Sequence, residues 1–195
     1  VPAGVRFEQL WLNGVRQTRC RLGNSWMKSV ESVAPTDPSA GHDGFVAPKG
    51  PDWQTLMLDP STQVLAVHTW TMSRNRIKSY DPDSGVLRFR KATAVPDYLG
   101  AMPKGGRFLI ESASLPLGPG QWRHQTAEGI AQVRPQSGAQ WENANVEVPL
   151  ADQLLVAAGS ADRPIQHLRF EGIAWEGNQW LLGPDGRMFY QAEAD

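Results

Sequence analysis

An Asn13-Gly14 pair near the front of the chain restricts the fold more than any other sequence feature. Short apolar segments lie on both sides of it. A two-residue hairpin turn of type I′ needs positive φ at both central positions, and Asn-Gly is a pair that adopts this turn readily. We therefore expect an antiparallel hairpin whose strands cover residues 5–12 and 15–22.

Three arginines, Arg16, Arg19 and Arg21, crowd the return strand of this hairpin. A plain hairpin needs no such cluster. Because guanidinium groups donate hydrogen bonds to carboxylates and to sugar hydroxyls alike, two roles are open. The arginines pair with carboxylates such as Glu8 or Glu111 and lock the sheet, or they face a glycan.

Turn-forming residues recur along the whole chain, which holds 19 glycines and 15 prolines. No long segment repeats apolar residues at helical spacing, and short alternating runs are typical of strands. Further strands are expected at residues 64–72, 74–80, 86–90, 129–134, 144–149 and 165–175, a strand or helical turn at 107–113, and an irregular loop at 32–52. These patterns predict an all-β fold, an antiparallel sandwich or barrel.

The charges are balanced, with 19 Lys and Arg against 20 Asp and Glu and a formal net charge of −1. This balance gives no reason to expect nucleic acid or an anionic membrane surface as a partner. No apolar run approaches the roughly 20 residues that span a bilayer. The chain starts at Val1-Pro2 without a leader pattern, so we expect a removed signal or a piece excised from a longer protein.

Metal and cofactor chemistry find no support in the sequence. Cys20 is the single cysteine, which excludes a disulfide within the chain and a cysteine-based metal site. The four histidines lie far apart and lack a metal-ligand spacing. Neither a glycine-rich phosphate loop nor a Gly-x-Ser-x-Gly elbow occurs. We therefore expect neither a metal nor a cofactor.

Eight tryptophans are many for a chain of 195 residues. Sugar rings stack their apolar faces on indole rings, so the set predicts a large core, a carbohydrate-binding surface or both. The candidates for exposed platforms are Trp26, Trp53 and Trp141, together with Trp175 and Trp180 in a glycine-rich tail. Those expected in the core are Trp11, Trp70 and Trp122.

Paired carboxylates are the remaining route to catalysis, as in glycoside hydrolysis, where two Asp or Glu side chains flank the bond. The acidic candidates are Glu8, Asp43, Asp52, Asp59, Glu111, Glu128, Glu142, Glu147 and Glu171. The sequence does not say which of them face each other. Glu111 and Glu171 stand out because each follows an apolar strand segment.

Several segments together resemble a known family. Residues 7–24, with the Leu10-Trp11-Leu12-Asn13-Gly14 run and the arginines, resemble the start of the accessory β-domain found within many bacterial right-handed parallel β-helix glycoside hydrolases. Further matches follow in the same order: Trp70 with Ile77 and Gly85, residues 107–111 with Leu115 and residues 119–122, and residues 167–175, which resemble the rung at which the β-helix resumes. The departures from the family pattern are Ser112, Gly118, Gln121 and Arg123.

The resemblance implies a carbohydrate-recognising or cleft-shaping domain of a secreted or periplasmic enzyme, with a polysaccharide or oligosaccharide as ligand. It implies a β-sandwich or barrel at residues 1–160 and a β-helix-like rung or tail at 161–195. In such enzymes the catalytic carboxylates generally lie on later rungs, so no catalytic residue is carried over to this chain. A β-helix catalytic domain of the same polypeptide is the expected partner.

Two other functions stay open at this point. In the first, the chain is a small glycoside hydrolase or polysaccharide lyase, and Glu111 and Glu171 are its catalytic candidates. In the second, it is a structural domain without a ligand. For the glycan-binding function, the candidate side chains are Trp26, Trp53, Trp141, Arg19 and Arg21.

Overall fold

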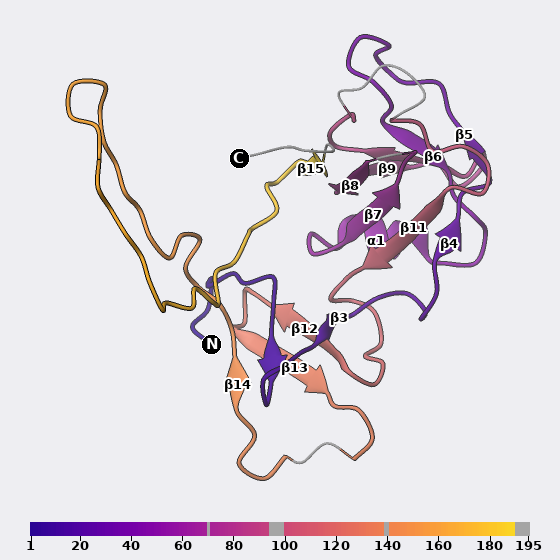
Figure 1. The fold of residues 1–195 in the computed structure, drawn as a ribbon. Coiled ribbons are helices and arrows are strands. Elements are labelled where there is room, and N and C mark those ends of the chain that lie inside the picture. Colours follow the sequence, from indigo (N-terminus) through magenta and orange to yellow (C-terminus); the bar gives the residue numbers. More distant parts are fainter. Residues whose placement is uncertain (70, 94–99, 139–140, 190–195) are drawn as a thin grey trace.

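In the computed structural model the chain forms two β-sheet bodies and one long protruding arm (Figure 1). The structure describes residues 1–69, 71–93, 100–138 and 141–189. Nearly all regular elements are strands, and most pair antiparallel, which confirms the predicted all-β fold. β3 (Thr18–Arg19) and β12 (Gln121–Gln125) instead pair parallel. None of the four sheets in the described ranges closes into a barrel.

The larger body contains two sheets that share one core. The first sheet holds, in order, β15 (Gly186–Phe189), β8 (Met72–Asn75), β7 (Gln63–Val67), β11 (Arg107–Glu111) and β4 (Met27–Lys28). The second holds β5 (Glu31–Ser32), β6 (Gly44–Val46), β10 (Val86–Phe89) and β9 (Ile77–Tyr80). Phe45 of β6 packs on Phe108 of β11 with ring centroids 4.7 Å apart, so the two sheets form a sandwich.

The smaller body also combines two sheets. One holds β14 (Val146–Glu147), β1 (Trp11–Leu12) and β2 (Val15–Arg16), and the other holds β13 (Ile130–Arg134), β12 and β3. Its core consists of Phe7, Leu10 and Trp122. The rings of Phe7 and Trp122 stack with centroids 5.3 Å apart. This small aromatic core confirms the interior position expected of Trp122.

The hairpin at the front of the chain has the predicted turn. Asn13 and Gly14 have φ values of 52° and 73°, as a type I′ turn requires. The strands are much shorter than the predicted ranges, however, since β1 and β2 hold two residues each. The chain leaves this sheet after Arg16 and pairs with β12 in another sheet. The sequence pattern marks extended backbone but not this change of partner.

Three further segments differ from the prediction. The expected loop at residues 32–52 contains β6, and a short helix, α1 (Trp53–Leu58), follows it with Asp52 as its N-cap. The expected run at 74–80 is split, because β8 pairs with β7 while β9 pairs with β10. Arg76 turns the chain between the two sheets, and its Nη1 donates a 2.7 Å hydrogen bond to the carbonyl oxygen of Pro60.

The arm, defined as residues 151–178, leaves the smaller body and returns to it (Figure 1, orange to yellow). Every residue in it is exposed. A bridge pairs Ala151 with Asn178 at its base, and a second pairs Ser160 with Arg163 near its tip. The alternating segment 165–175 was expected to be a strand but forms none. His167 and Gly172 have φ values of 61° and 65°, which interrupt extended backbone, and no strand in the described ranges is paired with it. The chain then reaches β15 at the edge of the larger body.

No helix within the described residues is long and apolar enough to cross a membrane.

Candidate functional site

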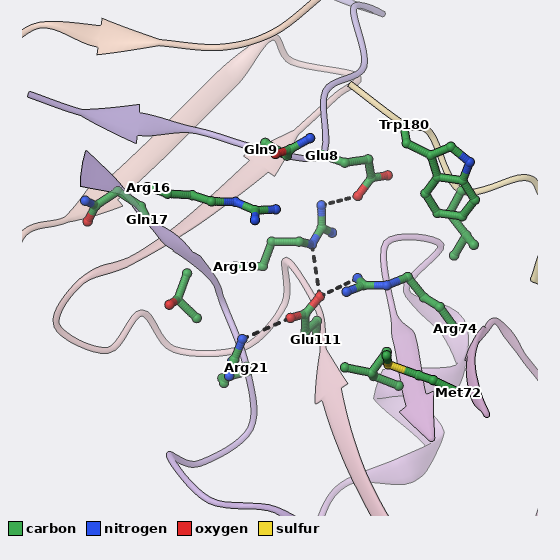
Figure 2. Close-up of a pocket in the computed structure, with 13 residues that line it drawn as sticks. Glu8, Gln9, Arg16, Gln17, Arg19, Arg21, Met72, Arg74, Glu111 and Trp180 are labelled. Carbon is green, nitrogen blue, oxygen red and sulfur yellow. Dashed lines mark hydrogen bonds and ion pairs between the residues drawn. The ribbon is translucent and has the colours of Figure 1, made fainter. Parts of the chain in front are cut away.

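A pocket of about 580 Å³ lies between the two bodies and the C-terminal segment that carries Trp180 (Figure 2). We call it the guanidinium pocket, because four arginines line it. Its polar lining consists of Glu8, Gln9, Arg16, Gln17, Thr18, Arg19, Arg21, Arg74 and Glu111. Its apolar lining consists of Leu65, Met72, Trp180 and Leu182. Pockets of this size commonly hold small ligands.

The path of the hairpin's return strand explains why three arginines meet here. Arg16 ends β2, Arg19 ends β3, and Arg21 forms an isolated bridge with Glu111 of β11. The chain thus passes from the smaller body to the larger one within six residues. Arg19 and Arg21 are two positions apart in extended backbone, so their side chains project to the same side.

Glu111 is the centre of the ion pairs in the pocket (Figure 2). Its carboxylate oxygens lie 2.8 Å from Nη1 of Arg74, 3.2 Å from Nη2 of Arg21 and 3.5 Å from Nε of Arg19. The Glu111 side chain is only 4% exposed. A buried carboxylate has given up its hydration and needs cationic partners of this kind. Removing these partners strongly destabilises the fold. Of the two roles open to the arginine cluster, pairing with Glu111 is therefore found for Arg19 and Arg21.

Glu8 extends the network toward the smaller body. Its carboxylate lies 2.5 Å from Nη1 of Arg19 and 3.7 Å from Nη2 of Arg6. It also accepts a 3.2 Å hydrogen bond from Nε2 of Gln63, whose Oε1 accepts a 2.7 Å bond from Arg74. Arg19 therefore joins Glu8 to Glu111 and connects the two bodies.

Positive charge exceeds negative charge in the pocket lining. Four guanidinium groups stand against the carboxylates of Glu8 and Glu111. Within the described residues Arg16 has no carboxylate partner; its guanidinium stacks on the Trp11 ring, 5.9 Å from the centroid. The Nε atoms of Arg19 and Arg21 are buried and lack a hydrogen-bond partner in the described structure. The pocket is thus electropositive and rich in donors.

A second pocket of about 790 Å³ adjoins the first, since Glu8 and Arg19 line both. Two of its acid–base groups are held by structural contacts. Burial alone would raise the pKa of Asp59, but hydrogen bonds, led by one of 2.5 Å from Ser112 Oγ, outweigh burial and leave that pKa below its usual value. Burial lowers the pKa of His124, whose ring stacks on Phe7 at 4.1 Å. Neither side chain is presented to a ligand as a free acid or base.

The predicted tryptophan platforms have different positions. Trp53 is 2% exposed, and its indole N–H donates a 2.9 Å hydrogen bond to the carbonyl oxygen of Pro48. The placement of Trp53 on a surface was therefore wrong, because α1 turns its ring into the core. Trp26 is 41% exposed with Arg107 over its ring, and Trp141 is 50% exposed. Neither of these two lines the guanidinium pocket. Trp70 lies outside the described residues.

The two catalytic candidates do not face each other. Glu111 is enclosed in the guanidinium pocket, whereas Glu171 lies on the arm, is 68% exposed and pairs with Arg169. The arm projects away from β11 (Figure 1). Hydrolysis by a carboxylate pair needs the two groups within about 10 Å across one bond. This pair provides no such arrangement.

Metal-ligating and thiol groups add no second site. Among the described residues, no group of three or more His, Cys, Asp or Glu side chains is placed to hold a metal ion. Cys20 is buried, and its thiol donates to the carbonyl oxygen of Leu115 at 3.2 Å. Burial raises the pKa of this thiol, so the thiolate needed for nucleophilic chemistry is disfavoured.

Two important residues of the pocket could not be placed there from the sequence. Arg74 reaches Glu111 because β7 lies between β8 and β11 in the sheet, and this register is invisible in the sequence. Trp180 was expected to be exposed, and it is 37% exposed, but nothing in the sequence places it beside the arginine cluster. The only signal for Arg74 in the sequence is that it lies between two small polar residues, Ser73 and Asn75. The structure shows that both of these are buried.

Comparisons with known proteins give one informative result. No protein-family model matches the chain, and no curated protein matches it. A solved structure titled "Glycoside hydrolase" superposes with a TM-score of 0.70 at 21% sequence identity, over 92% of this chain and 33% of that one. The chain therefore shares a fold with a part of that protein and spans about a third of its length.

Proposed function

We propose that this chain is a non-catalytic, glycan-recognising domain of a larger glycoside hydrolase. Its proposed binding site is the guanidinium pocket. The arginine-rich lining of this pocket is the observation on which the proposal mainly rests. The likeness to a third of a structure titled glycoside hydrolase supports the idea of one domain among several. Secretion or export to the periplasm belongs to the same proposal, because extracellular polysaccharides are the ligands it implies.

The chemistry of the pocket suits a sugar ring. Arginine and glutamine side chains carry planar arrays of donors that match ring hydroxyls. The indole of Trp180, which has the Arg187 guanidinium 5.6 Å from its ring centroid, adds apolar surface to the same wall. Ligand sites usually combine an apolar wall with a few oriented polar groups. The fixed positions of Arg19 and Arg74 limit the ordering that binding requires, which favours affinity.

The pocket suits binding better than hydrolysis. A general acid must hand a proton to the leaving oxygen. Glu111 instead directs both carboxylate oxygens to guanidinium groups and is 4% exposed. We therefore assign Glu111 a structural role and place the catalytic carboxylates in a parallel β-helix domain of a longer polypeptide.

We further propose that the arm docks on that β-helix domain. Its exposed apolar side chains are Leu154, Leu155, Val156, Ile165, Leu168, Phe170, Ile173 and Trp175. Exposed apolar side chains concentrated on one segment of a folded chain favour an interaction site there. The alternation at 165–175 is that of a strand still without a neighbour, and a β-helix rung would supply one.

Isothermal titration calorimetry with a panel of oligosaccharides tests the glycan proposal. We expect at least one glycan to bind and Trp180→Ala to weaken its affinity by about tenfold or more, because a stacked wall is lost. Trp26→Ala and Trp141→Ala are the matched controls and should bind as the wild type does. If no glycan binds, the domain has another function. If the controls lose binding while Trp180→Ala retains it, the site lies elsewhere on the surface.

Hydrogen exchange tests the docking proposal. Amides of the arm should exchange rapidly in the 195-residue chain and slowly in the longest polypeptide that the gene encodes. The amides of β12 serve as the internal control, because they are paired in both forms. Rapid exchange of the arm in both forms would contradict docking.

A further inference from the structure

The guanidinium pocket carries a charge surplus that a neutral sugar would leave uncompensated. Arg16, Arg19, Arg21 and Arg74 line it against the carboxylates of Glu8 and Glu111. Glu8 is in addition shared with Arg6, which lies 3.7 Å away. The chain as a whole has a formal net charge of −1, so this surplus is a local property of the pocket.

The hydrogen-bonding capacity of the arginines is also incompletely used. Arg21 donates to Glu111 through Nη2, while its Nε is buried without a partner in the described structure. Arg16 has no carboxylate partner there, and its guanidinium extends into the pocket (Figure 2). A guanidinium group has five N–H donors and no acceptor, so the four arginines give the pocket more donors than acceptors and more positive than negative charge.

We infer that the glycan bound in this pocket is acidic and that its carboxylate or sulfate group is held by Arg16 and Arg21. This inference rests on the proposed glycan-binding function and specifies its substrate class. Planar guanidinium groups bind such oxyanions through paired, charge-assisted hydrogen bonds, which are stronger than bonds to neutral hydroxyls. Uronic acids and sulfated sugars are the two sources of this chemistry.

The ion-pair network explains why these two arginines are the ones available. Glu111 holds Arg74, Arg21 and Arg19 at 2.8, 3.2 and 3.5 Å, and Arg21 uses only its Nη2 for this contact. Arg19 is also held by Glu8. Arg16 lies on the exposed strand β2 and has no carboxylate partner in the described structure, and Arg21, at 28%, is the most exposed of the three arginines that Glu111 holds. An incoming anion therefore reaches both while Glu111 keeps its ion pairs.

The test uses ligands that differ only in charge. Oligogalacturonate is compared with its methyl ester, and a sulfated galactan oligosaccharide with its desulfated form, by calorimetry on the 195-residue chain. We expect at least one acidic member to bind at least about tenfold more tightly than its neutral partner. The preferred pair identifies the anion. Raising the salt concentration should reduce the preference, because exposed charges are screened.

The variants Arg16→Gln and Arg16→Lys test whether the preference for the acidic glycan arises in the guanidinium pocket. Arg16→Gln should reduce the preference for the acidic glycan to less than about threefold. Arg16→Lys should retain part of this preference, because lysine keeps the positive charge but cannot form the paired hydrogen bonds of a guanidinium group. Arg163→Gln removes the same charge at the tip of the arm and is the matched control. The thermal midpoint of each variant is measured to verify folding, and β2 is exposed, so Arg16→Gln should fold.

Each other outcome has a distinct meaning. Equal binding of charged and neutral partners overturns this inference and leaves the glycan-binding function intact. A preference that survives Arg16→Gln also overturns it, since the anion then binds elsewhere. Binding of inorganic sulfate without any oligosaccharide contradicts it, because the pocket would be an ion site only. Absence of binding to every glycan overturns the proposed function and this inference with it.

Discussion

Glu111 and Glu171 have similar local sequences and opposite structural surroundings. Each follows a short apolar segment. Glu111 lies between three guanidinium groups with 4% of its side chain exposed, while Glu171 is 68% exposed and pairs with Arg169 alone. The difference shows that an apolar segment before a carboxylate does not predict whether a partner strand encloses that carboxylate.

The same contrast separates Trp122 from Trp175. Trp122 is 1% exposed and stacks on Phe7, whereas Trp175 on the arm is 47% exposed and contacts Phe170 at 6.0 Å. The two bodies bury their own apolar residues, and the arm does not. We infer that the bodies hold the fold of this chain and that the arm is built to contact something else.

Replacing the two tryptophans should give the largest difference between body and arm. Trp122→Ala should lower the free energy of unfolding by about 3–5 kcal/mol, because it opens a cavity in a three-residue core. Trp175→Ala should change it by less than about 0.5 kcal/mol. Urea unfolding followed by circular dichroism measures both. Similar losses for the two variants would mean that the arm packs on the body in solution.

Replacing the two glutamates should give the next largest difference. Glu111→Gln keeps the shape but removes the charge that holds three arginines, and we expect a loss of about 3 kcal/mol. Glu171→Gln should cost less than about 0.5 kcal/mol, because exposed ion pairs contribute little. The thermal midpoint and urea curves of both variants provide the measurement. A loss below about 1 kcal/mol for Glu111→Gln would show that the network positions side chains without holding the bodies together.

The local turns and the ion pairs of the site could be predicted from the sequence to different degrees. Asn13-Gly14 determines its own backbone, so the first hairpin was predictable. The excess of cations on one strand predicted pairing with carboxylates such as Glu8 or Glu111 as one of two roles, and Arg19 and Arg21 do pair with Glu111. Arg74 could not be predicted, because its contact with Glu111 depends on the order of β8, β7 and β11.

The errors in the prediction have physical causes as well. α1 is six residues long and buries only Trp53 and Leu56, which is too short for a helical period to show. The polar neighbours of Trp53 suggested exposure, but a single helical turn directs its ring inward. At 165–175 the alternation was present and the neighbouring strand was not, so the β-helix-like rung remains a prediction.

A buried histidine in the larger body provides a pH-dependent measure of that body alone. Burial lowers the pKa of His68, whose Nε2 lies 2.8 Å from Ser73 Oγ and whose Nδ1 lies 3.2 Å from the carbonyl oxygen of Ala101. The folded-state pKa is thus below the unfolded value of about 6.5. Above pH about 6.5 the histidine is neutral in both the folded and the unfolded state, and its full contribution to stability is present. As the pH falls from there toward the folded-state pKa, the unfolded state takes up the proton first and this contribution is lost.

The free energy of unfolding of the wild type should therefore decline from pH 7 toward pH 5 more steeply than that of His68→Gln. Ser73→Ala is the matched control, because it removes the same hydrogen bond and keeps the titrating ring. Its slope with pH should follow the wild type. Parallel slopes for the wild type and His68→Gln would exclude this histidine as a source of acid sensitivity.

Removing the arm should have the smallest effect on stability and is the most direct separation of the two regions. The ends of the arm already meet, since Ala151 bridges Asn178 and the carbonyl oxygen of Ala151 accepts a 2.9 Å hydrogen bond from the Gln179 N–H. Four Gly and Ser residues in place of 152–177 should therefore close the gap. Shortening an exposed loop in this way lowers the entropic cost of closing it, and we expect the free energy of unfolding to rise by about 1 kcal/mol or to stay the same.

Thermal unfolding measures this change. Titration with the preferred glycan is the control, because the guanidinium pocket holds no residue of the arm. A loss of several kcal/mol would contradict the division into self-sufficient bodies and an unpartnered arm.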